Sequence, residues 1–300
     1  MNKNFILIFG LLLYFTSCDV VETPYMNNEN VNPIDTNSNS YVKKVLIEDF
    51  TGQKCPNCPS AANEIKAIQN IYGDQVVAIA IHASAAFARP STDSTDLATN
   101  RYQYDFRTSW GDNWHEFYDI NGELPKGMVN RTGYSNNHKL FYEEWANAVT
   151  NELNKEADFG IIINSNSSTV NIKTEILNNL SGSFGLVVCL TENGIINWQK
   201  YISENIEDYE HNHVLRSVLV DEELSNNSNY ESGQEIEKSI NYDLTSLEQL
   251  NIDHSYTNSI SGPGTGNAGD WNAENMYIVA YIYDNVTKEI MQVEEAPLNN

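Results

Sequence analysis

The sequence predicts two folded domains, an α/β domain followed by an all-β antiparallel sandwich. The chain has 300 residues, more than a single hydrophobic core usually organises. Between residues 45 and 81 the pattern runs strand, helix, strand, whereas after residue 156 it consists of short alternating strands between turn-rich spacers. We therefore expect the α/β domain at residues 41–156 and a sandwich of immunoglobulin-like type at residues 157–300.

The first residues predict a lipoprotein signal peptide at residues 1–17. Lys3 precedes an apolar run from Phe5 to Phe15, which is too short to cross a bilayer as a helix. The run leads through Thr16 and Ser17 into Cys18, and small residues before a cysteine resemble a bacterial lipobox. This resemblance implies cleavage before Cys18 and a lipid on Cys18 that makes the membrane a partner. The alternative is an ordinary signal peptide that happens to contain a cysteine.

Composition limits the partners of the exported chain. Residues 18–40 are rich in Asn, Ser, Thr, Pro and acids and show no apolar period, which predicts a flexible acidic tether. The whole chain carries 41 acids against 17 Lys and Arg, a formal net charge of −24. Nucleic acid is therefore not an expected partner, because phosphate binding needs a basic surface. The glycines of the loop 262–267 lack phosphate-binding spacing, so we expect no nucleotide or other cofactor.

The α/β domain is predicted from alternating patterns. Strands at residues 45–50 and 76–81 flank a helix at residues 59–72, with Pro59 in its first turn and Ala61, Ile65 and Ile68 on its inner stripe. Two strands joined in this way form a parallel unit. Residues 83–122 are expected to be a helical insertion, with helices at 93–108 and 114–118 and a break at 109–113. A turn at Leu124-Pro125, a short strand and a helix at 140–153 complete the domain.

The second domain is predicted from strands alone. Six runs of alternating or continuous apolar residues lie at 159–163, 169–176, 186–191, 214–220, 236–242 and 276–283. No long helix is expected among them, which is typical of an antiparallel sandwich.

The motif Cys55-Pro56-Asn57-Cys58 lies where the first strand gives way to the first helix. Free N–H groups and the positive end of the helix dipole can stabilise a thiolate there, so Cys55 is the candidate nucleophile and Cys58 its resolving partner. Export to an oxidising compartment makes a Cys55–Cys58 disulfide the expected resting state. A zinc site would need a second cysteine pair or two histidines at matching spacing, and no metal is expected.

These elements together resemble the thioredoxin fold. The resemblance implies that Pro125 forms the cis-proline turn beside the cysteines and that Asp49, six residues before Cys55, assists proton transfer to the resolving thiol. The segment Glu48 to Gly52, the motif at 55–58 and the later His211-Asn212-His213-Val214-Leu215-Arg216 resemble the Omp28-related outer membrane lipoproteins of Bacteroidetes-type bacteria. That resemblance implies a thioredoxin-like domain, a β-rich C-terminal domain and an outer membrane location.

The sequence is compatible with two functions. The first is thiol–disulfide exchange at Cys55 and Cys58 with Asp49 and Pro125, acting on cell-envelope proteins that contain disulfides. The alternative is a non-catalytic binding or adhesion lipoprotein in which Cys55–Cys58 is a structural disulfide. His82 is predicted to be a hydrogen-bonded residue at a strand end, and His211 and His213 lack an identifiable third metal ligand. Cys189 is predicted to be a buried apolar residue.

Overall fold

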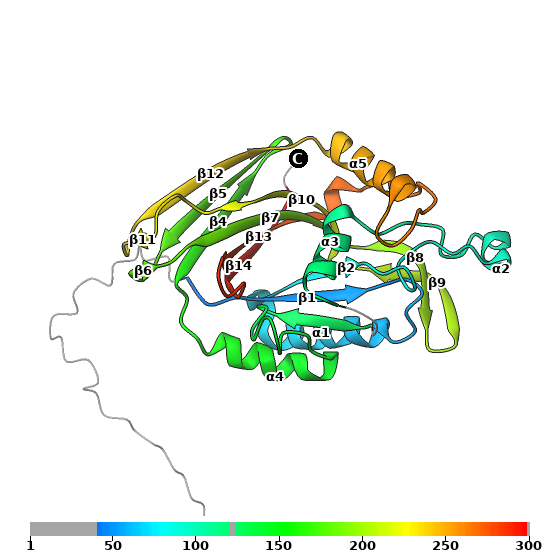
Figure 1. The fold of residues 1–300 in the computed structure, drawn as a ribbon, viewed down its shortest axis with the longest axis horizontal. Coiled ribbons are helices and arrows are strands. Elements are labelled where there is room, and N and C mark those ends of the chain that lie inside the picture. The colour runs from blue at the N-terminus through cyan, green and yellow to red at the C-terminus, as the bar shows by residue number, and fades with distance from the viewer. Residues whose placement is uncertain (1–40, 121–123, 299–300) are drawn as a thin grey trace, which may run out of the picture. The chain divides into compact units, whose positions relative to one another are not determined.

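A seven-stranded sheet in the order β14-β13-β7-β10-β2-β1-β3 runs through the computed structural model (Figure 1). The structure describes residues 41–120 and 124–298. The strands of the seven-stranded sheet are β1 (Val45–Thr51), β2 (Val76–His82), β3 (Lys126–Val129), β7 (Phe184–Glu192), β10 (Val214–Glu223), β13 (Met276–Asp284) and β14 (Ile290–Pro297). There are three smaller sheets in the described residues. One contains β4 (Phe159–Ser165), β5 (Thr169–Ile176) and β12 (Glu235–Asn241). The second pairs β6 (Leu180–Ser181) with β11 (Asn229–Tyr230), and the third pairs β8 (Ile195–Tyr201) with β9 (Glu204–His211).

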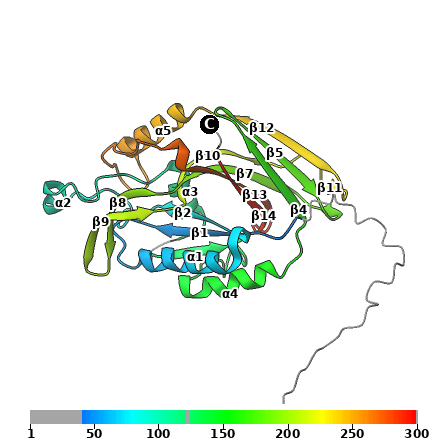
Figure 2. The ribbon, with the colours of Figure 1, turned by 180° about the vertical axis from the view of Figure 1, so that it is seen from behind.

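Helices from the first half of the chain cover one part of the large sheet. They are α1 (Cys58–Tyr72) and α4 (Tyr142–Leu153), which lie along β1 in Figures 1 and 2. The buried stripe of α1 packs with Val45 and Ile47 of β1 and with Trp145 of α4. Pro59 occupies the first turn of α1, where its missing N–H has no intrahelical partner to lose. The predicted strand, helix, strand unit is present, since β1 and β2 pair in parallel.

The second part of the large sheet is covered by a second layer of strands. Every residue of β7 is buried, because its alternate side chains enter two different cores. Leu186, Val188 and Leu190 pack against the sheet β12-β5-β4, while Val187 and Cys189 pack with Trp114 of α3 (Ser109–Phe117). This arrangement is a mixed α/β fold with large antiparallel sheets.

The structure does not divide at the expected boundary between residues 156 and 157. β10 pairs in parallel with β2 and antiparallel with β7, so strands from both predicted domains share one sheet. Residues from Tyr41 onward accordingly form one compact unit. The sequence patterns describe each strand's own faces, but they carry no information about which strands become neighbours.

Several predicted elements are wrong in detail. Only α2 (Ser94–Ala98) is helical within the predicted helix 93–108, and the predicted break at 109–113 lies inside α3. The expectation of no long helix after residue 156 is also wrong, because α5 (Leu244–Thr257) follows β12. In the part of the chain that the structure describes, no helix is long and apolar enough to cross a membrane.

Candidate redox site

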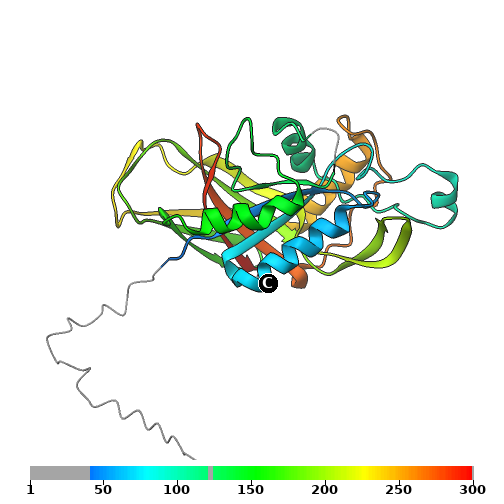
Figure 3. The same cartoon turned by 90° about the horizontal axis from the view of Figure 1, so that it is seen from below.

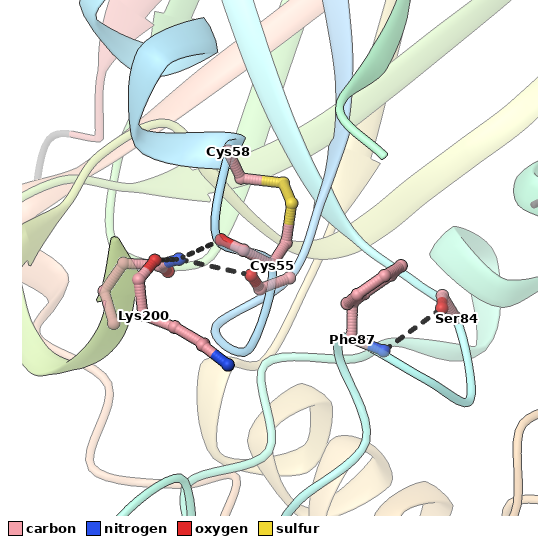
Figure 4. The surroundings of a disulfide bond; sticks show 7 residues. Cys55, Cys58, Ser84, Phe87 and Lys200 are labelled. Atoms are coloured by element: carbon pink, nitrogen blue, oxygen red, sulfur yellow. Dashed lines mark hydrogen bonds between the residues drawn. A yellow bond between two sulfur atoms is a disulfide. The ribbon is translucent and has the colours of Figure 1, made fainter. Parts of the chain in front are cut away.

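The cysteine loop, residues 52–57, connects the end of β1 to the start of α1 at Cys58. The Cys55 N–H donates to the Gly52 carbonyl at 2.9 Å, which closes the loop into a tight turn. Position 52 requires glycine, because a Cβ there would lie 2.6 Å from the main-chain carbonyl carbon of Phe87. Cys55 and Cys58 are joined by a disulfide, with their Cα atoms 5.5 Å apart (Figure 4). The predicted pairing is therefore present.

Two other segments enclose the cysteine loop. The Lys54 N–H donates to the Phe87 carbonyl at 2.9 Å on one side, and the Lys200 N–H donates to the Gln53 carbonyl at 2.8 Å on the other. Figure 4 shows Lys200 and Phe87 on opposite sides of the disulfide. As a result Cys55 is 0% exposed and Cys58 is 2% exposed.

The hairpin of β8 and β9 supplies most of this cover. The Ile202 N–H donates to the Pro56 carbonyl at 2.8 Å, and the buried Gln199 side chain donates from Nε2 to the Cys55 carbonyl at 3.0 Å. The sequence does not predict this hairpin, because its turn lacks the usual turn residues. Residues 202 and 203 are Ile and Ser, and Ile202 has φ 55°, a conformation that two-residue turns usually assign to Asn or Gly.

Asp49 lies on β1 in the interior. Its side chain is 2% exposed, and its Oδ1 has no hydrogen-bond partner. Burial raises the pKa of this carboxyl from 3.8 to about 8, because the charged form is poorly solvated. At neutral pH Asp49 is therefore mainly protonated and can give up a proton. This is the state expected of a buried acid that serves a nearby thiol.

A cavity of about 480 Å³ lies between α1 and β9, over the ends of β1 and β2. Figure 3 shows α1 beside the β8–β9 hairpin. The polar side chains in its wall include Asp49, His82, Tyr209, His211 and His213, and Cys58 and Ala62 line it from α1. Cys55 is not among the lining residues. The cavity thus brings the buried acid and one cysteine of the disulfide to the same space.

The three histidines of this wall have nitrogen atoms without partners, namely His82 Nδ1, His211 Nε2 and His213 Nδ1. Burial lowers the pKa of His211 and of His213 to about 4, and burial with the neighbouring His211 puts the pKa of His82 well below its usual range. The imidazoles are therefore neutral at physiological pH. His82 is expected from the sequence to be hydrogen bonded at a strand end, and its Nδ1 is not the atom that makes such a bond. Over residues 41–120 and 124–298, no three His, Cys, Asp or Glu side chains form a set that could hold a metal ion.

Pro125 lies at the same end of β1 as the cysteine loop. β3 pairs antiparallel with β1 in a register that sets Lys126 opposite Phe50, so the preceding Pro125 falls beside Thr51. Pro125 is buried and the Leu124–Pro125 bond is cis. Cys18 lies outside the described residues. Cys189 is fully buried on β7, and burial raises the pKa of its thiol.

Comparison with a family model connects part of the chain to a known group. Residues 111–257 match the model of the family described as Outer membrane protein Omp28. The resemblance predicted from the sequence is therefore confirmed over a stretch that begins in α3 and ends in α5. The cysteine loop precedes this stretch. No curated protein matched the chain.

One solved protein of low sequence identity has a similar fold, and two others align with lower scores. HBP35 of Porphyromonas gingivalis aligns with a TM-score of 0.59 and 13% identity, over 86% of this chain and 76% of that chain. The Agrobacterium tumefaciens protein AGR_C_4864 aligns with a TM-score of 0.49 and 12% identity, over 87% and 96% of the two chains. A domain of the outer membrane lipoprotein Omp28 from Porphyromonas gingivalis aligns with a TM-score of 0.26 and 18% identity, over 48% of this chain and 89% of that chain.

Proposed function

Because this chain resembles the Omp28 family over residues 111–257, we propose that it is an outer membrane protein, anchored by lipid on Cys18, that carries out thiol–disulfide exchange at Cys55 and Cys58. The observation that carries the exchange proposal is the disulfide at the start of α1, with Cys58 in the wall of the same cavity as Asp49. A cysteine pair two residues apart at the beginning of a helix is typical of exchange centres.

The proposal includes a thioredoxin-like arrangement of the first half of the described chain. β1, α1 and β2 form a parallel unit, β3 adds antiparallel to β1, and α4 packs beside α1. Pro125 comes immediately before β3, beside the end of β1 that leads into the cysteine loop. These neighbours support the proposed thioredoxin-like arrangement.

Exchange at this site is a balanced transfer between sulfurs. A thiolate attacks one sulfur of Cys55–Cys58, the bond between the two cysteines breaks, and its electron pair stays on the other sulfur. That sulfur then takes a proton, and Asp49 can donate it because its pKa of about 8 leaves it protonated at neutral pH. A second thiol releases the mixed disulfide and leaves Cys55 and Cys58 reduced. The reverse sequence oxidises the two cysteines.

The reduction potential of the Cys55–Cys58 pair tests exchange. We would equilibrate the purified protein in glutathione redox buffers and count alkylated cysteines by mass. We expect a potential above about −270 mV, in the range of exchange proteins. A value below about −300 mV would contradict the proposal, since structural disulfides of exported proteins lie there.

A second candidate function is a binding or adhesion lipoprotein in which the disulfide is structural. The complete burial of Cys55 favours it, because the β8–β9 hairpin closes the face from which a protein disulfide would approach. The low potential just described would support this candidate.

Membrane anchoring is tested separately. In a bacterial host that processes lipoproteins, the natural chain should fractionate with the outer membrane and take up labelled fatty acid, whereas Cys18→Ser should do neither. Uptake of label by the Cys18→Ser variant would contradict attachment at this residue.

A further inference from the structure

We propose that Cys58, and not Cys55, is the sulfur that exchanges with partners, and that its partner is a small thiol or disulfide of the amino-acid or short-peptide class. This inference rests on the proposed exchange function and names the substrate of the same site. It follows from which of the two cysteines lines the cavity and from the size and polarity of that cavity.

Cys55 is closed off by main-chain contacts on both sides of the loop. The carbonyls of Gln53, Cys55 and Pro56 already accept hydrogen bonds from the β8–β9 hairpin, at 2.8, 3.0 and 2.8 Å. These main-chain groups are therefore not free to pair with an extended protein segment. The hairpin limits the access of a protein substrate to Cys55.

Cys58 has a different environment, because it lines the cavity between α1 and β9. The volume of about 480 Å³ falls in the range of small-ligand pockets. A small thiol could therefore reach Cys58 while the hairpin stays in place.

The wall of the cavity offers hydrogen-bonding groups that have no partner in the protein. Asp49 Oδ1, His82 Nδ1, His211 Nε2 and His213 Nδ1 are buried and unpaired. Buried polar groups normally find a partner, so these atoms favour a polar occupant. Their pKa values make the inner wall uncharged at neutral pH, which favours recognition by hydrogen bonds.

Opposite charges lie in the outer wall of the cavity. Lys66 on α1 and Glu210 on β9 both line it and are exposed. A zwitterionic molecule, with an ammonium and a carboxylate group, complements this pair of charges. Small thiols built from amino acids carry both groups beside their sulfur.

The reaction balances with this class of partner as the reductant or oxidant. In the reducing direction the small thiol ionises and its thiolate attacks Cys58 Sγ, the Cys55–Cys58 bond breaks, and the electron pair stays on Cys55 Sγ. Cys55 then takes up the proton that the small thiol released. A second small thiol attacks the mixed disulfide on its own sulfur, releases a small disulfide and leaves both protein thiols reduced.

Single-cysteine variants test which sulfur reacts. We would incubate the folded, reduced variants Cys55→Ser and Cys58→Ser with oxidised glutathione and locate the adduct by peptide mass mapping. Cys58 in the Cys55→Ser variant should be labelled at least about tenfold faster than Cys55 in the Cys58→Ser variant, because exchange depends on access. Faster labelling of Cys55 would overturn this inference and leave the exchange function standing. Absence of adduct on both, together with a potential below about −300 mV, would overturn both proposals.

A blocked cavity keeps the inference testable if a cysteine variant fails to fold. Ala62 lies one turn after Cys58, is exposed and lines the cavity, so Ala62→Trp should obstruct it without entering the core. Reduction of the natural disulfide by glutathione should slow about tenfold in Ala62→Trp and stay unchanged in Ala67→Trp, an exposed position on the same helix outside the cavity wall. Equal rates in these two variants would contradict entry through the cavity.

Discussion

The side chain of Gln199 is hydrogen bonded to the main chain of Cys55. Its Nε2 donates to the Cys55 carbonyl at 3.0 Å, and Gln199 is itself 2% exposed. Gln199 belongs to β8, more than a hundred residues after the cysteine loop. The contact ties the hairpin of β8 and β9 directly to the disulfide and makes the closure of this site a property of both halves of the chain.

Replacement of Gln199 by leucine should open the site. The variant leaves the buried Cys55 carbonyl without a hydrogen-bond donor. The closed form of the β8–β9 hairpin should therefore lose about 1–3 kcal/mol of stability, and the population with the hairpin open should rise about tenfold. Reduction of the disulfide by a phosphine should speed up by a similar factor. Lys200→Ala is the matched control, since its main-chain N–H still bonds Gln53. Equal rates in the two variants would show that Gln199 does not hold the hairpin closed.

The sequence predicted the elements around the cysteines because their patterns are strong and local. The buried run from Val76 to His82 and the stripe of α1 lead directly to β2 and to the core beside Trp145. Asp49 and Cys58 line one cavity for the same reason, because one is fixed by a strand and the other by a helix start.

α5 escaped prediction because it is held by polar contacts. Its buried residues are Asn251 and Ser255, which donate to the Arg216 carbonyl at 2.8 Å and to Asp105 Oδ2 at 2.6 Å. No apolar stripe marks such a helix in the sequence. The cavity wall was missed in the same way, because His82 and His211 meet only through the pairing of β2 with β10 and the turn of a hairpin without a turn signal.

The stability of the protein should depend on pH through Asp49. An acid whose pKa rises on folding stabilises the folded state at low pH, and this contribution is lost as the pH rises toward the folded value of about 8. Between about pH 5 and pH 8 the natural protein should lose up to about 1.4 kcal/mol per pH unit relative to Asp49→Asn. Urea unfolding of both proteins across this range measures the difference.

Glu295 provides the control for that pH profile. Burial raises the pKa of Glu295 to about 7, so Asp49→Asn should retain part of the downward slope. The double variant Asp49→Asn with Glu295→Gln should flatten it further. Parallel profiles for the natural protein and Asp49→Asn would mean that Asp49 is ionised in the folded state.

Cys189 should be chemically silent in the folded protein. It is the free cysteine of the described chain, it is fully buried, and its raised pKa keeps it protonated. Iodoacetamide should therefore modify Cys189 only in denaturant, at a rate set by unfolding. Modification of the native protein at this residue within the time needed to label reduced Cys58 would show that β7 is exposed by local opening.

The buried ion pair of Glu48 and Arg131 should stabilise the protein strongly, and Tyr281 connects it to the second half of the chain. Arg131 donates from Nε and Nη2 to the Glu48 carboxylate at 2.8 and 2.6 Å, and from Nη2 to the Tyr281 hydroxyl at 2.8 Å. All three side chains are buried, and they come from β1, the segment after β3, and β13. Arg131→Met leaves the Glu48 charge without a partner, so it should lower the free energy of unfolding by about 3–5 kcal/mol.

A double variant separates the charge effect from lost packing. Glu48→Met with Arg131→Met removes both charges, and apolar replacement of a buried pair is often tolerated, so the double variant should be more stable than Arg131→Met alone. Urea denaturation of the natural protein, the two single variants and the double variant gives the coupling energy. If the double variant is less stable than Arg131→Met, the Glu48 side chain is held by contacts other than Arg131, and an unpaired Glu48 charge is not what destabilises Arg131→Met.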